Sequence, residues 1–576
     1  MTQSSVAPHR TRHIGTRHMA AAGHYLAAQV SLQVLEAGGN AIDAGVAGGI
    51  TLGVVQSEYV CFGGVAPTMI YWAETDEVIS ISGLGTWPAL TDASLFRTEH
   101  GNKMPPGLLR TIVPAAPDSW ITALERYGTM SFGECAAQAL RFARDGFPVP
   151  SLMAEIIADH EEEYRRWPAN AEIYLPGGKP PKAGDILVQP DLANTISYMI
   201  DEERAAAAKG GRAAGLSAAR NAFYKGDIAK AIVAYHREHG GWMREDDLAN
   251  FRVEVEKPAA VQFGDADIFT CGPWCQGPVL GQTFAMLDGI DLRALGHNSA
   301  EYIHLLVETM KLAYGDRHEL YGDPNFVDVP LAKLLSPEYA AERRKLIDTE
   351  AAHPGMPEAG LPSNWGRNPD PDPRNGRRDP GELDTSYVCV VDRHGNAFSA
   401  TPSDGSVGAP VIPGLGFVPS ARGVQSFLDP RAPAVAGPGR RPRLTPAPAF
   451  ARKKGEWIMP IGSPGNDVQP QAMLQTYLNL HVFGMTMQEA VDAPRFATFS
   501  YPRSSIPHSY DPGLLKLEAR IDPAIGDQLA AKGHDVKYWK DWEYAAGGVC
   551  SIIKNFNAGT LEGGSDSRRP TAVAGW

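Results

Sequence analysis

The sequence predicts an α+β protein, in which buried helices and short strands share one globular chain. Residues 41–55 (AIDAGVAGGITLGVV) are almost all small or apolar, and Asn40 stands where a helix cap is expected. Residues 386–400 instead combine β-branched, aromatic and apolar side chains on either side of a DRHGN turn, which is typical of a β-hairpin. Two such patterns in one chain indicate the mixed class.

Three further segments predict regular elements. Residues 298–315 (NSAEYIHLLVETMKLAYG) predict an amphipathic helix with a cap at Asn298. The Ala- and Gly-rich residues 203–220 predict a surface helix pair or a loop. The stretch 456–461 (EWIMPI) predicts a strand, followed by the tight turn GSPGN at 462–466 and then a helix. A strand, glycine turn and helix in this order leave backbone N–H groups free to donate to a group above the turn.

The composition and hydropathy of the chain exclude some classes of function. The chain has 576 residues, 43% hydrophobic and 21% charged, and a formal net charge of −13. Neutralising phosphates requires a clustered basic face, so we expect no nucleic-acid partner. No apolar run is long enough to cross a membrane, and the Arg- and His-containing start lacks the apolar core of a secretory signal. We therefore expect a cytoplasmic protein without a membrane partner.

The cysteines predict neither a disulfide framework nor a metal site. Six cysteines are spread along the chain, and only Cys271 and Cys275, in CGPWC, lie close together. That spacing is not C-x-x-C, and no second Cys/His pair completes a zinc site.

The glycines of GLGTWP at 83–88 do not fit a dinucleotide fingerprint, and no phosphate loop occurs. We expect no metal and no organic cofactor.

The junction before the hairpin is the strongest local candidate for catalysis. Residues 353–380 are rich in Pro, Gly, Asn and Arg, which favours a flexible lead, and Asp384-Thr385 follows it directly. A threonine hydroxyl is a weak nucleophile unless a base is adjacent. Cleavage between Asp384 and Thr385 would supply that base as the new α-amino group, whose pKa is near 8. The alternative is that Thr385 only begins a strand, and local pattern alone favours it.

The turn at 462–466 is the second candidate. Its N–H groups could stabilise an oxyanion during acyl transfer, whereas the alternative is an ordinary strand-to-helix turn. Ser463 in G-S-P-G does not match the G-x-S-x-G nucleophile motif, so a serine hydrolase is disfavoured.

Ten separated segments in one order are more specific than either motif. They are EAGGNAIDAGVAGGITLGVV, FGGVAPTM, ALERYGTMSF, ARDGFPV, NAFYKGDIAKAIV, GGWMREDDLANFRVE, DTSYVCVVDRHGNAFSAT, IGSPGN, EAVDAPRF and GGSDSRRPTAVAG. With these the chain resembles the γ-glutamyltransferase family of N-terminal-nucleophile hydrolases, from about residue 20 to its end.

The resemblance implies a four-layer αββα sandwich and an inactive precursor that cuts itself. The products would be a large chain, 1–384, ending in the flexible lead 353–384, and a small chain, 385–576, which remain associated. Thr385 would be the nucleophile. Ser403 falls where the family usually has a second threonine that orients the nucleophile. Gly465 and Asn466 fall on the paired glycines of the oxyanion hole, and Asn466 keeps the backbone N–H donor.

The departures from the family concern the substrate. The family's arginine for the substrate α-carboxylate is replaced by Leu84, and its serine pair by Leu444 and Thr445. The acid expected to hold the substrate amino group is missing from residues 420–427. Asp404 falls near a substrate-contacting asparagine, with a gap in the alignment. A site without these partners is expected to reject γ-glutamyl groups.

The sequence thus predicts a self-processing amidohydrolase acting on a small-molecule amide. The nearby Arg440, Arg441 and Arg443 favour an acidic, non-γ-glutamyl amide such as oxamate, with water or an amine resolving the acyl-enzyme; the alternative for these arginines is a solvated loop. Another alternative is a genuine γ-glutamyltransferase or glutathione hydrolase with a rebuilt carboxylate clamp. An unprocessed, non-catalytic binding protein and a bond-cleaving role in a biosynthetic pathway also remain open.

Overall fold

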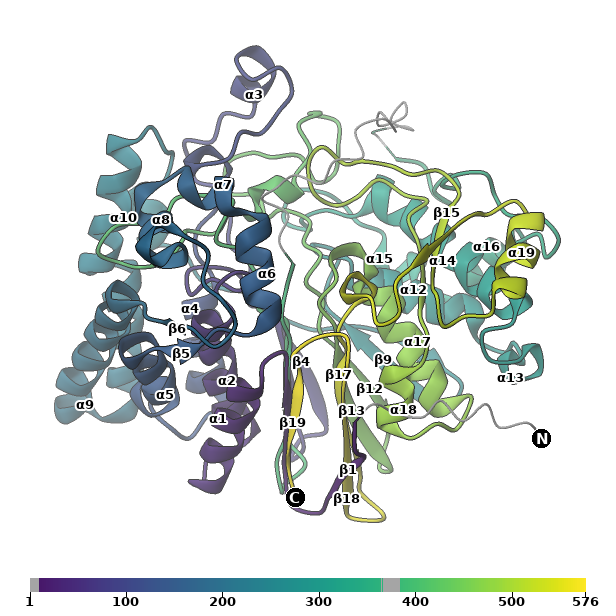
Figure 1. Ribbon diagram of the computed structural model, residues 1–576, viewed down its shortest axis with the longest axis horizontal. Coiled ribbons are helices and arrows are strands. Elements are labelled where there is room, and N and C mark those ends of the chain that lie inside the picture. The colour runs from purple at the N-terminus through teal and green to yellow at the C-terminus, as the bar shows by residue number, and fades with distance from the viewer. Residues whose placement is uncertain (1–9, 364, 366–383) are drawn as a thin grey trace.

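Two stacked β-sheets lie between two layers of helices in the computed structural model, which describes residues 10–363, 365 and 384–576 (Figure 1). Each sheet has seven strands. Helices of the first half of the chain cover one sheet, and helices from the middle and the end cover the other (Figure 1). The predicted α+β class and the αββα sandwich are confirmed.

The first sheet contains the predicted hairpin. In spatial order its strands are β19 (Ala572–Gly575), β2 (Met19–Ala22), β10 (Val388–Val391), β11 (Ala397–Ala400), β3 (Thr68–Trp72), β4 (Glu77–Ile81) and β7 (Val255–Glu256). β10 and β11 pair antiparallel with Val388 opposite Ala400. The hairpin is confirmed, although its first strand begins at Val388 and not at Ser386.

The second sheet contains the predicted strand before the glycine turn. Its spatial order is β1 (His13–Gly15), β18 (Thr560–Ser565), β17 (Cys550–Asn555), β13 (Trp457–Gly462), β12 (Ala449–Lys453), β9 (Ala266–Thr270) and β8 (Ala259–Phe263). Two smaller sheets comprise β14 (Phe496–Thr498), β15 (Leu514–Glu518) and β16 (Asp535–Trp539), and β5 (Phe147–Pro148) with β6 (Ile186–Leu187). Because β13 ends at Gly462, the turn that follows lies at the end of the central strand of this sheet.

The helices beside the first sheet include the predicted buried helix. They are α1 (Tyr25–Glu36), α2 (Ala41–Val55), α4 (Ala116–Tyr127), α5 (Phe132–Asp145), α6 (Ser151–Asp159), α7 (Glu161–Arg165), α8 (Pro168–Tyr174), α9 (Pro190–Tyr224) and α10 (Asp227–Glu238), with the short α3 (Ser94–Thr98) and α11 (Glu245–Ala249). Every residue of α2 is buried, and the Asn40 side chain accepts from the N–H groups of Ile42 and Asp43. Residues 203–220 lie in α9, which is interrupted at Gly211, so the predicted helix pair is confirmed.

The helices beside the second sheet correct one expectation. They are α12 (Gly277–Leu287), α13 (Leu292–Leu295), α14 (Ala300–Leu320), α15 (Leu331–Leu334), α16 (Pro337–Arg344), α17 (Gln469–His481), α18 (Met487–Asp492) and α19 (Pro523–Ala531). The helix predicted at 298–315 is α14, but Ser299 caps it, not Asn298. It is not amphipathic: only Glu301 and Leu305 escape burial, because α12, α19 and β14 pack around it.

Short 3₁₀ turns join these elements. They are η1 (Leu108–Arg110), η2 (Pro176–Gly178), η3 (Arg422–Gln425), η4 (Asn466–Val468) and η5 (Tyr544–Ala546). All six cysteines are free and buried. No helix in the described ranges combines the length and the apolar character needed to cross a membrane.

The predicted lead, 353–384, is described only in part. The N–H of Met356 donates to the Tyr510 hydroxyl at 2.6 Å, and Trp365 packs against His318 and Phe427. Residues 364 and 366–383 lie outside the described residues. The division into chains 1–384 and 385–576 therefore stays a prediction.

Candidate active site

Thr385 and Ser403 face each other just beyond the hairpin. Val388 pairs with Ala400 in the antiparallel register, so three residues further out Thr385 lies opposite Ser403, where the two form an isolated bridge. Their hydroxyl oxygens are 2.9 Å apart, and the Gln469 side-chain amide approaches Thr385 Oγ1 at 3.4 Å. Thr385 is 1% exposed. The hairpin register therefore places the Ser403 hydroxyl within hydrogen-bond distance of the candidate nucleophile.

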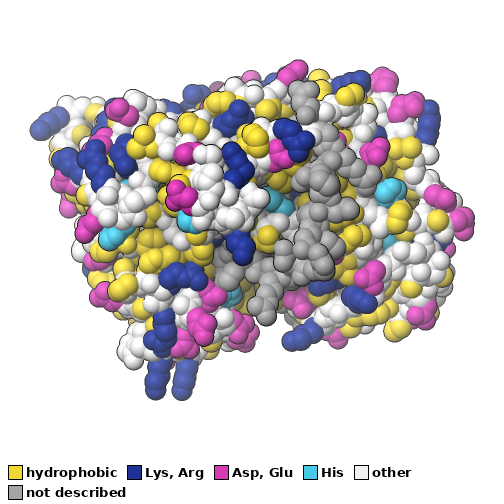
Figure 2. Space-filling view, turned by 90° about the horizontal axis from the view of Figure 1, so that it is seen from above, with side chains coloured by type: hydrophobic (Ala, Val, Ile, Leu, Met, Phe, Trp, Pro, Cys, Tyr) yellow, Lys and Arg dark blue, Asp and Glu magenta, His cyan; other side chains and the backbone are white. Residues whose placement is uncertain are grey.

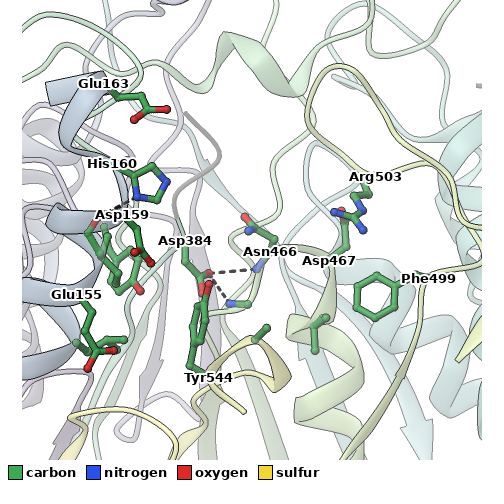
Figure 3. A pocket seen from close by; sticks show the side chains of 16 residues that line it. Glu155, Asp159, His160, Glu163, Asp384, Asn466, Asp467, Phe499, Arg503 and Tyr544 are labelled. Atoms are coloured by element: carbon green, nitrogen blue, oxygen red, sulfur yellow. Dashed lines mark hydrogen bonds between the residues drawn. The ribbon is translucent and has the colours of Figure 1, made fainter. Parts of the chain in front are cut away.

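The 465–466 turn points two backbone N–H groups at Asp384. The nitrogens of Gly465 and Asn466 lie 2.6 and 3.3 Å from Asp384 Oδ1 (Figure 3). Both residues have positive φ, 125° and 50°, values that glycine adopts freely and asparagine tolerates. Gln276 holds the turn from behind by donating to the Asn466 carbonyl at 2.8 Å. This pair of converging donors has the form of an oxyanion hole.

Arg569 binds the other oxygen of the Asp384 carboxylate. Its guanidinium donates to Asp384 Oδ2 and, at 2.8 Å, to the Tyr544 carbonyl. Burial opposes the charged form, yet the Asp384 carboxylate raises the pKa of Arg569 above its ordinary value. The carboxylate of the residue before Thr385 is therefore held between the turn and a buried cation.

The backbone carbonyl of Asp384 has different partners. It accepts from the Ser403 hydroxyl at 3.2 Å and from Arg422 Nη2 at 3.3 Å, and Arg422 also donates to Ser403 Oγ. Arg422 begins η3 and is 4% exposed. This is the carbonyl of the peptide bond that the sequence predicts to be cut.

Asp404 lies behind Arg422. Its Oδ1 is 4.0 Å from Arg422 Nε and accepts from the Ala421 N–H at 3.1 Å, and its Oδ2 accepts from the Ser420 hydroxyl. Burial raises the pKa of Asp404 to about 6, while the Arg422 cation acts in the opposite direction. A Cβ on Gly64 would come within 2.3 Å of the Ser403 carbonyl oxygen, so this close approach requires glycine.

Of the other predicted substrate residues, Arg443, Leu444 and Thr445 lie on the loop before β12, and Leu84 follows β4. Leu84 is buried with Leu444 in the apolar cluster between the sheets. Thr445 Oγ1 accepts from the Gln425 side chain at 3.0 Å. Arg443 donates to the Arg317 carbonyl at 2.9 Å, and its Nε and Nη2 have no hydrogen-bond partner among the described residues. Burial and the nearby Arg317 cation lower the pKa of Arg443.

A cavity of about 420 Å³ opens from Asp384 and the 465–466 turn. Aromatic side chains of Tyr59, Phe499 and Tyr544 form part of its wall. An acidic rim of Glu155, Asp159 and Glu163, from α6 and α7, lies across the cavity from Asp467, Arg503 and Phe499 (Figure 3). On the face seen from above, acidic and basic side chains are interspersed rather than gathered by sign (Figure 2).

Sequence reasoning missed two cations of this site. Arg422 lies within SARGVQSF, the stretch that lacks the expected acid, and Arg569 lies within GGSDSRRP, one of the segments that carry the family resemblance. For Arg422 the available signal was a basic residue within the stretch 420–427, where the family resemblance calls for an acidic one.

A separate cluster of His304, Glu308 and His534 has side-chain ligand atoms within 4.8 Å of one another. Lys311 Nζ lies 2.6 Å from Glu308 Oε1, so an ammonium already neutralises the carboxylate. His304 Nδ1 is 2.9 Å from His534 Nε2, which is a hydrogen bond between the rings. These contacts form an internal polar network.

A stacked αββα sandwich with a hydroxyl residue at the start of a central strand defines the N-terminal-nucleophile class of amide-bond hydrolases and acyltransferases. The family model described as Gamma-glutamyltranspeptidase matches residues 27–576, and the chain belongs to this family.

Named relatives differ in what they act on. The chain is 34% identical to an Acylase ACY 1 proenzyme of a Pseudomonas species, over 97% of this chain and 94% of that one. It is 30% identical to a Glutathione hydrolase proenzyme of Bacillus subtilis (98% and 92%) and 30% identical to an Oxamate amidohydrolase proenzyme of Klebsiella pneumoniae (98% and 99%). The crystal structure of cephalosporin acylase from Bacillus halodurans superposes with a TM-score of 0.84 at 27% identity, covering 100% and 99% of the two chains.

Proposed function

We propose that the protein is a self-processing N-terminal-threonine amidohydrolase that hydrolyses a small, acidic, non-γ-glutamyl amide. One observation carries the proposal: the Ser403 hydroxyl links the Thr385 hydroxyl to the Asp384 carbonyl, and the N–H pair of the 465–466 turn binds the carboxylate of the same buried Asp384. Cleavage before Thr385 would release its α-amino group beside its own hydroxyl. Nucleophile, base and oxyanion donors would then stand together.

The reaction follows from these groups. The Thr385 α-amino group takes the hydroxyl proton as Oγ1 adds to the substrate carbonyl. The carbonyl oxygen, now negative, takes the place of Asp384 Oδ1 and accepts from Gly465 and Asn466. The protonated amine then transfers its proton to the leaving nitrogen, and water hydrolyses the resulting ester.

The contacts of Asp384 support an acidic acyl group. In the uncleaved chain one carboxylate oxygen occupies the turn and the other meets Arg569. An amide with a carboxylate on the adjacent carbon, as in oxamate, presents an oxygen to each of these partners. The Klebsiella relative named for oxamate is consistent with such a substrate.

Other residues of the site disfavour a γ-glutamyl substrate. Its α-ammonium group requires an acid near residues 420–427, but that stretch instead supplies the buried Arg422 cation. The positions that hold the family's arginine and one of its serines carry Leu84 and Leu444, which are buried in the apolar cluster and offer the α-carboxylate no charged or hydroxyl partner. Even one missing charged hydrogen bond costs about 1.5–3 kcal/mol.

An acylase that releases a bulky amine is the second candidate. The cavity of about 420 Å³ exceeds the needs of ammonia, its aromatic wall fits an apolar leaving group, and its acidic rim favours a cationic amine. The Pseudomonas acylases and the cephalosporin acylase fold support this alternative.

The test compares kcat/KM at neutral pH for oxamate, malonamate, succinamate, succinyl anilide and a γ-glutamyl anilide. We expect one or more of the first three to exceed the γ-glutamyl anilide by orders of magnitude. Preference for succinyl anilide would select the acylase. Efficient turnover of the γ-glutamyl compound alone would select the glutathione hydrolase. No turnover, with a stable uncut chain, would indicate a binding protein.

A further inference from the structure

We propose that Arg422 is a catalytic residue of the self-cleavage step, where its guanidinium and the Ser403 hydroxyl stabilise the oxyanion that forms on the Asp384 carbonyl. The inference rests on the proposed cleavage between Asp384 and Thr385. It separates two oxyanion sites in one protein: one for maturation and one for substrate.

The donors and acceptors that each group carries fix the direction of each hydrogen bond. Arg422 carries only donors, so Ser403 Oγ must accept from it. The Asp384 carbonyl can only accept, so the Ser403 hydroxyl hydrogen points to it. With that hydrogen committed, the Thr385 hydroxyl donates to Ser403 Oγ across 2.9 Å. The network therefore polarises both the attacking oxygen and the carbonyl under attack.

The 465–466 turn cannot serve this step in the uncleaved chain. Its two N–H groups are engaged by the Asp384 side chain, while the carbonyl of the same residue lies on Ser403 and Arg422. Arg569 anchors the side chain from its other oxygen. The carboxylate and the carbonyl of Asp384 thus have separate sets of donors.

Arg422 is held in place for this role. Asp404 lies 4.0 Å from its Nε, and Ser420 and Ala421 donate to that carboxylate. The next residue, Gly423, packs so closely that a Cβ there would lie 2.4 Å from the Arg110 carbonyl oxygen. Asp404 is accordingly a positioning residue for the guanidinium.

The step balances with water as its only other reactant. A bond forms between Thr385 Oγ1 and the Asp384 carbonyl carbon, and the carbonyl electrons move to the oxygen held by Arg422 and Ser403. When the oxyanion collapses, the bond from that carbon to the Thr385 nitrogen breaks, and the nitrogen takes the proton lost by the hydroxyl. Water then hydrolyses the ester, leaving a carboxylate on Asp384 and a free hydroxyl on Thr385.

The experiment follows cleavage of freshly synthesised full-length chain in a time course, read by intact mass, for wild type, Arg422→Lys, Arg422→Gln and Arg422→Ala. We expect Arg422→Gln and Arg422→Ala to slow the appearance of the chain that begins at Thr385 by on the order of 10²-fold or more. Arg422→Lys should be intermediate, because an ammonium keeps the charge but not the paired geometry. Free guanidinium chloride at low millimolar concentration should accelerate Arg422→Ala, an effect that a merely structural residue would not show.

The controls separate the possible failures. Arg431→Gln neutralises an exposed arginine further along the same loop and should mature at the wild-type rate. If folded Arg422→Gln or Arg422→Ala matures as fast as wild type, the inference is wrong while self-cleavage stands. If both neutral variants fail to fold, the Arg422→Lys variant decides. An unchanged maturation rate in Arg422→Lys overturns the proposed role of Arg422, and a maturation rate lowered by about tenfold or more supports it. If wild type never yields a chain beginning at Thr385, the proposed function itself fails.

Discussion

The carboxylate of Asp384 accepts a hydrogen bond from the Gly465 backbone N–H, with 2.6 Å between Oδ1 and the nitrogen. The residue before the candidate nucleophile thus fills the position that a substrate carbonyl oxygen would take. Oxyanion donors act on charge that develops at their own location, so a hole filled by a carboxylate is closed to substrate. The proposed cleavage would make Asp384 a chain end that can leave the hole, and we therefore expect the uncleaved chain to be inactive.

Ser403 provides a prediction on both reactions. Ser403→Ala removes the hydroxyl that contacts Thr385 Oγ1 and the Asp384 carbonyl, so self-cleavage and turnover should each slow by about tenfold or more. Ser403→Thr keeps the hydroxyl and should restore both. The measurement is the maturation time course together with kcat on the best amide. Wild-type rates in the alanine variant would remove Ser403 from the mechanism.

Asn466 tests the backbone origin of the oxyanion hole. Its φ of 50° suits glycine, and its contact with Asp384 is made by the N–H, so Asn466→Gly should keep kcat within about threefold. Asn466→Val carries a β-branched side chain that resists positive φ, and it should lose activity through a displaced turn. A severe loss in the glycine variant would show that the side chain takes part.

Asp404 predicts the pH dependence of maturation. Burial raises the pKa of Asp404 to about 6, so its charge is lost as pH falls through that value. A neutral Asp404 orients the Arg422 guanidinium less well, and self-cleavage should slow below about pH 6. The neighbouring Cys61 does not titrate there, since burial raises the pKa of Cys61 to about 12. Asp404→Asn should be slow throughout and lack this acid limb; an unchanged limb would assign it to another group.

Glu58 predicts a pH-dependent stability. Glu58 is buried in the turn that follows α2, and burial raises its pKa from 4.5 to about 8. The folded state therefore binds this proton more tightly than the unfolded state, and the associated stability, present below pH 4.5, is lost as pH rises to about 8. The slope is about 1.4 kcal/mol per pH unit at most. Glu58→Gln should flatten this pH dependence of the free energy of unfolding and raise Tm at pH 8 relative to wild type. Equal Tm profiles from pH 5 to 8 would contradict the assignment.

Local patterns predicted the elements that carry the site. The all-apolar run after Asn40, the hairpin residues and the strand before the turn each form as expected, because burial and turn chemistry there agree with the fold. The periodicity of residues 298–315 predicts a helix with one solvent-exposed face, but it does not reveal that three other elements pack around this helix. Arg422 and Arg569 meet Asp384 only through tertiary structure, so neither spacing nor composition pointed to them.

The most direct test of the central claim is the intact mass and amino-terminal sequence of the purified protein. Sharing 62.0 kDa over 384 and 192 of 576 residues gives chains of roughly 41 and 21 kDa, the smaller beginning at Thr385. Thr385→Ala, which removes the attacking hydroxyl, should remain one chain of 62.0 kDa without activity, and Thr385→Ser should still be cut. Active wild-type enzyme with no chain beginning at Thr385, or Thr385→Ala cut at the wild-type rate, would contradict the account.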